Sequence, residues 1–177
     1  LRSPLTSIRG YASMILDGSF GKLPKKAEDA VQRIADSSEF MATSVEDYLN
    51  VSRIEAGNMK YELIDFNLKD LTETVVDNKR QEAVKKGLLL TFSSTMKTHG
   101  IVNADRGKVR QILHNLINNA LKYTPKGKVE VTVNDDPNQK KLYVAITDTG
   151  VGLTPEDIDT LFQKFERAKG ASHVNAS

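Results

Sequence analysis

The sequence predicts an α+β protein made of an N-terminal helical hairpin followed by an α/β sandwich, in which helices cover one face of a mixed sheet. Two observations support this fold class. Up to about residue 56 the apolar residues recur at helical spacing, whereas from Tyr61 onward strand-like and helix-like segments alternate. We therefore expect two domains, residues 1–57 and residues 58–177.

The hairpin is predicted from two apolar stripes separated by glycines. The first stripe steps alternately by four and three residues, which is the seam of a helix that packs in coiled-coil fashion. Gly18 and Gly21 bracket the break, and a second helix is expected from Pro24 to about Ile54. The stripes consist of Leu1, Leu5, Ile8, Ala12 and Ile15, and then of Ala27, Val31, Ile34, Met41, Val45, Tyr48 and Leu49. Two helices alone have too little core, so we expect a homodimer that forms a four-helix bundle.

The second domain is predicted from signals in the order strand, helix, strand, helix, strand, strand. The first helix should end at Gly87, and the last two strands should pair as an antiparallel hairpin. The predicted strands are residues 61–66, 88–92, 129–133 and 142–146, and the predicted helix caps are Asn67, Asp105 and, after the last strand, Thr154.

The composition argues against several classes of protein. The net charge of +2 comes from 25 basic and 23 acidic residues that form no block, so nucleic-acid binding is not indicated. The absence of cysteine excludes disulfides and thiolate metal sites. No apolar run approaches the roughly 18 residues of a membrane span, so we expect no membrane contact by this chain.

The helix predicted from Asp105 to Pro125 carries three polar residues beside its apolar stripe. Asn115, Asn119 and Lys122 share a flank about 60° wide at 3.6 residues per turn. Two amides and an ammonium suit an anionic ligand with a metal, because amide oxygens are hard ligands for Mg²⁺ and lysine binds phosphate. The alternative is a solvated face on which the amides merely contact water. The predicted stripe is Val109, Ile112, Leu113, Leu116, Ile117 and Ala120.

The last predicted strand runs into the sequence Asp-Thr-Gly-Val-Gly. Asp148 has the parity of the apolar residues before it, so a regular strand would point its carboxylate to the core side, where a charge requires a partner. An ionised carboxylate only accepts hydrogen bonds and suits the amino group of a purine, while the glycines let a flat ligand approach. The alternative is an acidic residue that opens a glycine turn.

The helix that Thr154 caps has an apolar face that includes Phe162 and Phe165. By spacing, these two side chains belong to a core rather than to a cofactor site. From Glu166 to Ser177 the sequence shows no periodicity, which is typical of a loop or a chain end.

Four motifs in one order resemble a sensor histidine kinase of bacterial two-component signalling, over nearly the whole chain. The tail of the family's phosphoacceptor segment is matched by LRSPLTSIRGYA, and its asparagine box by NLINNALKYTP. The first glycine box is matched by DTGVGL, and the phenylalanine box by LFQKFERA. Each motif alone is weak, but four in the family's order are specific. The resemblance implies a dimeric four-helix bundle joined to an ATP-binding sandwich of the Bergerat type.

In the asparagine box, the resemblance implies that Asn115 and Asn119 bind Mg²⁺-ATP. Asn119 is the direct metal ligand that it favours, with Asn115 as the second candidate. Lys122 and Tyr123 are implied to contact phosphate and ribose.

In the two later boxes, the resemblance implies that Asp148 contacts adenine. Gly150 and Gly152 would shape the adenine pocket, and Phe165 would anchor the lid over ATP.

In the family, the acceptor histidine lies two positions before the residue that matches Leu1, and so outside this chain. His99, His114 and His173 stand at other positions and are interpreted as ordinary polar histidines. A second glycine-rich box should follow the lid, beyond Ser177. We therefore expect the second domain to be C-terminally incomplete, and this chain to bind Mg²⁺-ATP weakly and not to autophosphorylate.

For the complete protein, the resemblance implies transfer of the ATP γ-phosphoryl group to a histidine and then to an aspartate on a response-regulator receiver domain. Ser3 occupies the position at which relatives with phosphatase activity often carry Thr or Asn, so we expect weak or no phosphatase activity. The alternatives are a non-catalytic dimerisation and nucleotide-binding module, such as a degenerate kinase or phosphotransfer scaffold, and an unrelated ATPase of the same sandwich fold. The implied location is cytoplasmic, as in the cytoplasmic part of a membrane receptor.

Overall fold

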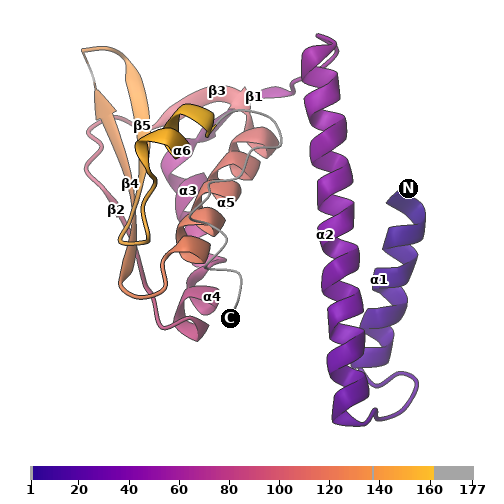
Figure 1. Ribbon diagram of the computed structural model, residues 1–177. Coiled ribbons are helices and arrows are strands. Elements are labelled where there is room, and N and C mark those ends of the chain that lie inside the picture. The colour runs from indigo at the N-terminus through magenta and orange to yellow at the C-terminus, as the bar shows by residue number, and fades with distance from the viewer. Residues whose placement is uncertain (1, 137, 162–177) are drawn as a thin grey trace. The chain divides into compact units, whose positions relative to one another are not determined.

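The computed structural model describes residues 2–136 and 138–161. The chain divides into two compact units, one up to Lys60 and one from Tyr61 onward. Figure 1 shows the first unit as a pair of helices and the second as strands backed by helices. This is the order of architectures that the sequence predicts.

The first unit is an antiparallel hairpin of α1 (Arg2–Leu16) and α2 (Lys25–Glu55). Gly18 and Gly21 in the connecting turn have φ angles of 80° and 97°, a region that side chains with a Cβ rarely adopt. Because α2 has 31 residues and α1 has 15, α1 lies along only the half of α2 that is nearer the turn (Figure 1). Both predicted helices are confirmed.

The hairpin leaves its two apolar stripes largely exposed or half-buried. Among its described residues, Ala12 and Ser38 are the buried ones, and the Ser38 hydroxyl donates a 2.8 Å hydrogen bond to the carbonyl oxygen of Ile34. Predicted inner side chains such as Ile34, Met41 and Tyr48 are 46–65% exposed. Two helices cannot cover both stripes, so the hairpin needs further apolar surface to form a core.

The second unit contains a mixed sheet and a separate pair of strands. Strands β2 (Leu89–Ser94), β4 (Lys128–Asp136) and β5 (Lys141–Asp148) form the mixed sheet, with β2 parallel and β5 antiparallel to the central β4. Strands β1 (Leu63–Asn67) and β3 (Ile101–Asp105) pair antiparallel. The predicted hairpin of the last two strands is therefore confirmed.

The helices of this unit are α3 (Leu68–Asp77), α4 (Arg80–Lys85), α5 (Arg106–Tyr123) and α6 (Pro155–Thr160). Two sequence predictions need correction. The helix expected to run to Gly87 is divided into α3 and α4, and no glycine or proline marks the break. Strand β3 was not predicted, because its sequence of five residues, IVNAD, lacks a regular alternation of apolar and polar side chains.

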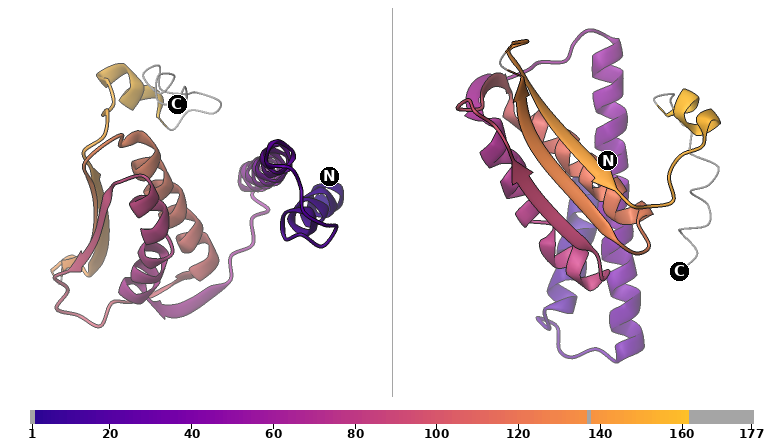
Figure 2. Two further views of the ribbon diagram at one scale, coloured as in Figure 1. Left: turned by 90° about the horizontal axis from the view of Figure 1, so that it is seen from below. Right: turned by 90° about the vertical axis from the view of Figure 1, so that its left-hand side faces the viewer.

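Helices α3 and α5 cover one face of the mixed sheet, as the left-hand view of Figure 2 shows. Alternate residues of β4 point into the core between these layers, where Val129, Val131 and Val133 are at most 1% exposed. The helices start at the predicted caps: the Asn67 side chain accepts a hydrogen bond from the amide of Asp70 at 3.2 Å. The Asp105 carboxylate does the same for the amide of Lys108 at 3.0 Å.

Candidate functional site

Helix α5 carries the first set of predicted site residues. Its buried side is formed by Leu113, Ile117, Ala120 and Leu121. Asn115, Asn119 and Lys122 are all exposed and lie outside this buried side, as their helical spacing predicts. The side chain of Asn119 makes no hydrogen bond with another residue in the described part of the chain. Its amide is therefore available to a ligand.

The predicted apolar stripe of α5 needs a correction at two positions. Ile112 and Leu116 are 57% and 50% exposed, although both were expected in the core. At about 100° per residue these two side chains lie between the buried side of the helix and the flank of Asn115 and Asn119. An exposed apolar strip thus borders the two amides.

The last turn of α5 places an ammonium beside an aromatic ring. The Nζ atom of Lys122 lies 5.1 Å from the centroid of the Tyr123 ring, within the range of a cation–π interaction. Lys122 is exposed and Tyr123 is half-buried. This contact restrains the lysine at the end of the helix while leaving its ammonium accessible to an anion.

Strand β5 ends at the second set, and here the expectation for Asp148 is only partly met. Asp148 pairs with the buried Val129 and so lies on the core side of the sheet, as its parity predicts, but at the strand end it is exposed. Its Oδ1 accepts a hydrogen bond from the amide of Gly150 at 2.8 Å. The carboxylate therefore does open a glycine turn. Its Oδ2 accepts no hydrogen bond from the described residues, which leaves one oxygen for the amino group of a base.

The glycine turn packs directly against the end of α5. The amide of Val151 donates a 3.1 Å hydrogen bond to the carbonyl oxygen of Tyr123. A Cβ added to Gly150 would overlap that carbonyl oxygen and lie 2.9 Å from its carbon, so only glycine fits. Gly152 has a φ of 72°, and a Cβ added to it would have no heavy atom within 4 Å. The absence of a side chain there leaves this edge of the turn open. The two motifs, 25 residues and more apart in the sequence, are thus in direct contact.

These residues fit a nucleotide with a hard divalent cation. The amide oxygens of Asn115 and Asn119 suit Mg²⁺, Lys122 suits a phosphate, and the free oxygen of Asp148 suits an adenine amino group. No group of three or more His, Asp or Glu side chains comes together among the described residues to hold a metal. A cation bound here would therefore take its ligands from the asparagine amides and from the phosphates of the nucleotide.

Phe165 and Ser3 are the remaining predicted site residues. Phe165 lies outside the described residues, so its expected lid contact stays a prediction. Ser3 is exposed on α1, and its carbonyl oxygen accepts a 3.2 Å hydrogen bond from the hydroxyl of Ser7. The position of Ser3 is compatible with contact to a partner, and its phosphatase role also stays a prediction.

A polar cluster on another side of α5 was not foreseen. The Nδ2 atom of Asn118 lies 3.1 Å from His114 Nδ1, and the Oδ1 atom of Asn118 is buried without a partner among the described residues. Burial lowers the pKa of His114 below its ordinary value, and the ammonium of Lys79 adds to this effect against the carboxylate of Glu82. Only the run of asparagines in the sequence could have signalled it.

Within the part of the chain that the structure describes, no helix combines the length and the apolar character that a membrane crossing needs. Comparison with known proteins identifies both units. Residues 1–57 match the family described as His Kinase A (phospho-acceptor) domain. Residues 104–176 match the family described as Histidine kinase-, DNA gyrase B-, and HSP90-like ATPase.

Individual proteins are similar to nearly the whole of this chain. The Non-motile and phage-resistance protein of Caulobacter vibrioides is 32% identical over 173 residues, which make up 96% of this chain and 20% of that protein. The crystal structure of full-length ShkA in complex with AMPPNP has a TM-score of 0.70 at 26% identity, covering 88% of this chain and 33% of that one. The Acinetobacter baumannii histidine kinase AdeS has a TM-score of 0.65 at 25% identity, covering 98% of this chain and 82% of that one.

The chain spans about a fifth of the length of its Caulobacter relative. The order of the two families along the chain, a helical hairpin and then a mixed α/β ATPase unit, is the order predicted from the four motifs. The ATPase family implies ATP binding by the second unit. The chain belongs to the sensor histidine kinases of two-component signalling and forms their catalytic core, a His Kinase A hairpin followed by an ATPase domain.

Proposed function

We propose that the second unit binds Mg²⁺-ATP between the end of α5 and the glycine turn after β5, for transfer of the γ-phosphoryl group to a histidine. The observation that carries this proposal is the hydrogen bond from the Val151 amide to the Tyr123 carbonyl oxygen. It joins the strand end that presents Asp148 to the helix that presents Asn115 and Asn119. ShkA, a structure of the same fold, was solved in complex with AMPPNP, which supports nucleotide binding by this chain.

Each residue has a defined task in this proposal. Asp148 accepts a hydrogen bond from the adenine amino group, Asn119 and then Asn115 offer amide oxygens to Mg²⁺, and Lys122 neutralises phosphate. Tyr123 restrains Lys122 and borders the ribose. When bound, Mg²⁺ supplies charge neutralisation on the phosphates. The protein contributes position and a fixed electrostatic environment.

The acceptor imidazole would come from outside these 177 residues. His99 lies in the loop between β2 and β3, and His114 lies on α5 with side-chain contacts to Asn115 and Asn118. We therefore propose that the 177-residue chain does not label itself, whereas the complete protein passes phosphate to its own histidine and then to a receiver-domain aspartate. We also propose that the hairpin dimerises and that the protein acts in the cytoplasm.

The test is a titration of the chain with ADP in the presence of Mg²⁺, followed by NMR so that weak binding is measurable. Asn119→Ala and Asp148→Asn should each weaken binding by about tenfold or more, since each removes an interaction with a charged group worth about 1.5–3 kcal/mol. Asn138→Ala is the matched control, because Asn138 is exposed in the β4–β5 turn at a distance from this site. Equal affinity in all four proteins would contradict the proposed site.

Phosphoryl transfer needs a separate experiment on the complete protein. Incubation with ATP labelled at the γ-phosphate should give an acid-labile phosphoprotein, and Asn119→Ala should abolish the label. A complete protein that binds ADP but takes up no label would instead be a non-catalytic nucleotide-binding module.

A further inference from the structure

Thr149, the residue between Asp148 and the first glycine, is bound to the turn that connects α5 to β4. The amide of Lys128 donates a 3.0 Å hydrogen bond to Thr149 Oγ1, and the Thr149 amide donates in return to the Lys128 carbonyl oxygen at 3.1 Å. The hydroxyl also lies 3.4 Å from the carbonyl oxygens of Lys126 and Lys128. One side chain therefore links the two loops that border the proposed nucleotide site.

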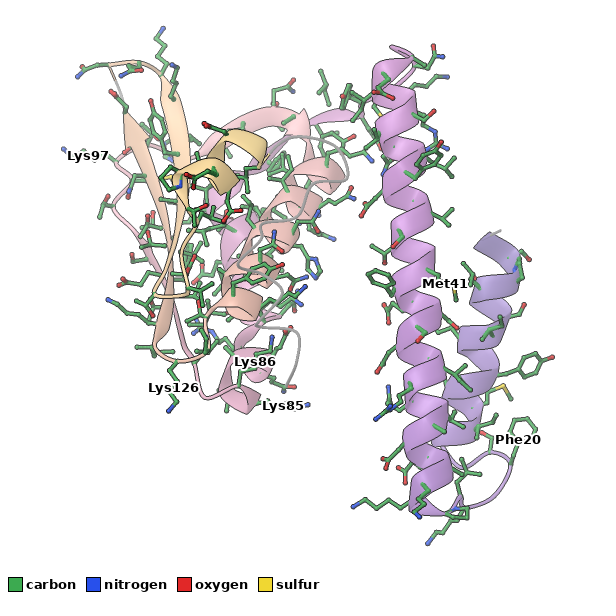
Figure 3. All side chains as sticks on the ribbon, viewed as in Figure 1. Phe20, Met41, Lys85, Lys86, Lys97 and Lys126 are labelled. Carbon is green, nitrogen blue, oxygen red and sulfur yellow. The ribbon has the colours of Figure 1, made fainter. Side chains whose placement is uncertain are left out.

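Gly127 completes this link. Its φ is 117°, and a Cβ added to it would overlap Thr149 Oγ1 and lie 3.3 Å from Thr149 Cβ. The threonine hydroxyl thus occupies the space that the absent side chain of Gly127 leaves. The carbonyl oxygen of Gly127 also accepts a 3.1 Å hydrogen bond from the Leu89 amide, so the turn is held to β2 as well. Figure 3 labels Lys126 in this turn, at one end of the unit.

The two residues after Thr149 each donate a backbone hydrogen bond to a residue of the proposed site. The Gly150 amide donates to the Asp148 carboxylate, and the Val151 amide donates to the Tyr123 carbonyl oxygen. Loss of the Thr149 hydroxyl bonds would loosen the start of the segment that runs from the end of β5 to Val151. The Asp148 carboxylate would then lose the backbone support on its C-terminal side.

We propose that Thr149 is a positioning residue for adenine recognition: its hydroxyl holds the β5 end to the α5–β4 turn, and so keeps Asp148 and the glycine turn in the binding geometry. This inference rests on the proposed function of the site. The apparent affinity of a site falls by the fraction of time that it is competent to bind. Because one hydrogen bond contributes about 0.5–1.5 kcal/mol, loss of the hydroxyl should shift the equilibrium toward the released conformation about threefold to tenfold and lower that fraction by up to the same factor.

The test compares Thr149→Val, which removes the hydroxyl at constant shape, with Thr149→Ser, which keeps it. The matched control is Thr147→Val, because Thr147 is exposed on the same strand and its hydroxyl makes no hydrogen bond with the described residues. Two quantities are measured: amide hydrogen exchange at Val151 without nucleotide, and binding of ADP and GDP by NMR titration. Unfolding in urea reports the stability of each variant.

The expected result is specific to Thr149→Val. Exchange at Val151 should become about threefold to tenfold faster, and ADP should bind more weakly by up to a similar factor, while GDP binding changes less. The preference for ADP over GDP should therefore decrease, because Asp148 reads the adenine amino group. Thr149→Ser and Thr147→Val should stay within about twofold of the unaltered chain, a change below about 0.5 kcal/mol.

A second variant tests the same contact from the other side. Gly127→Ala should speed exchange at Val151 in the unaltered chain, because its Cβ displaces the Thr149 oxygen. In a Thr149→Ala background that oxygen is absent, so the added effect of Gly127→Ala should be smaller. Additive effects in this double-mutant cycle would argue that the two residues act independently.

The outcomes separate the two proposals. If Thr149→Val lowers stability but leaves Val151 exchange, ADP affinity and the ADP preference unchanged, Thr149 has a structural role alone and the inference is wrong. If the unaltered chain itself gives no ADP-dependent shifts up to millimolar concentration, the proposed nucleotide site is wrong, and the positioning role with it.

Discussion

The carbonyl oxygen of Tyr123 accepts a 3.1 Å hydrogen bond from the amide of Val151. Tyr123 is the last residue of α5, whose C-terminal carbonyl groups have no partner within the helix. The glycine turn supplies one of these missing donors. A helix end and a strand end are thereby joined, and the two motifs of the ATPase unit come into contact.

Gly150→Ala should separate these two motifs. The new Cβ would overlap the backbone of Tyr123, which cannot move aside as a flexible side chain can. We expect the free energy of unfolding to fall by about 1–3 kcal/mol, as for other overpacked sites. Urea denaturation and ADP titration would measure the loss of stability and of binding.

Gly152→Ala is the control for this substitution. Gly152 has a positive φ, unlike Gly150, but nothing lies within 4 Å of its Cβ position. Only backbone strain of about 1–2 kcal/mol applies there. If Gly150→Ala destabilised the chain no more than Gly152→Ala, the close contact with Tyr123 would not be important.

Asn67 should contribute to stability through two separate contacts. Its Oδ1 accepts from the Asp70 amide at 3.2 Å, and its Nδ2 donates to the His99 carbonyl oxygen at 3.0 Å. Asn67→Ala removes both and should lower the free energy of unfolding by about 1–2 kcal/mol. Asn67→Asp keeps the cap and loses only the donor, so urea denaturation should place it between the other two proteins. Equal stability of Asn67→Ala and the unaltered chain would contradict a capping role.

Protonation of His114 should destabilise the folded ATPase unit. Because burial and Lys79 lower the pKa of His114 in the folded state, the unfolded chain binds this proton more readily. The free energy of unfolding should therefore fall as the pH drops through about 6.5, and the decrease should end once the pH is below the folded-state pKa.

The measurement is urea denaturation of the unaltered chain and of His114→Gln between about pH 7.5 and about pH 5.5, where Asp and Glu of ordinary pKa stay ionised. His114→Gln should show the smaller decrease. Identical pH profiles would mean that His114 titrates alike in the folded and unfolded states.

Met41→Lys should weaken association of the hairpin. Met41 is 46% exposed on α2 and lies on the side predicted to form a bundle core (Figure 3). A dimer would bury its side chain, and an unpaired ammonium in an apolar core is costly. We expect the dimer dissociation constant to rise by at least about tenfold in analytical ultracentrifugation.

Phe40→Lys is the control for association. Phe40 is 74% exposed and lies about 100° around the helix from Met41, away from the predicted seam. It should leave the dimer constant nearly unchanged. A stronger effect at Phe40 than at Met41 would place the dimer interface on another face of α2.

Helical spacing in the sequence correctly predicted which residues of α5 share one side of the helix. The exposed flank of Asn115, Asn119 and Lys122 follows from 3.6 residues per turn. The width of the buried side did not follow: Ile112 and Leu116 are apolar, yet the sheet and α3 do not cover them among the described residues. Helical periodicity predicts the side of the helix on which each residue lies, whereas the neighbouring elements decide how much of that side is buried.

The orientation of Asp148 shows the same limit in a strand. Alternation along β5 predicted a carboxylate on the core side, but Asp148 is the last residue of the strand and is exposed. Asp148 is still paired with Val129, so the pleat keeps it on the core side of the sheet, but at the end of the strand it is exposed and the nearest donor binds its carboxylate. That donor is the Gly150 amide, which only the turn geometry brings within 2.8 Å.

The sequence by itself determined the hairpin, the helix caps at Asn67 and Asp105, the antiparallel pair of β4 and β5 and the resemblance of the motifs to a histidine kinase. These features depend on contacts between residues close together in the chain. Only the tertiary structure decided that the Thr149 hydroxyl fills the space above Gly127 and that Val151 binds Tyr123. Such contacts join distant segments through backbone atoms. Every residue type has the same backbone atoms, so the sequence indicates such a contact only where a Cβ would not fit and glycine is required.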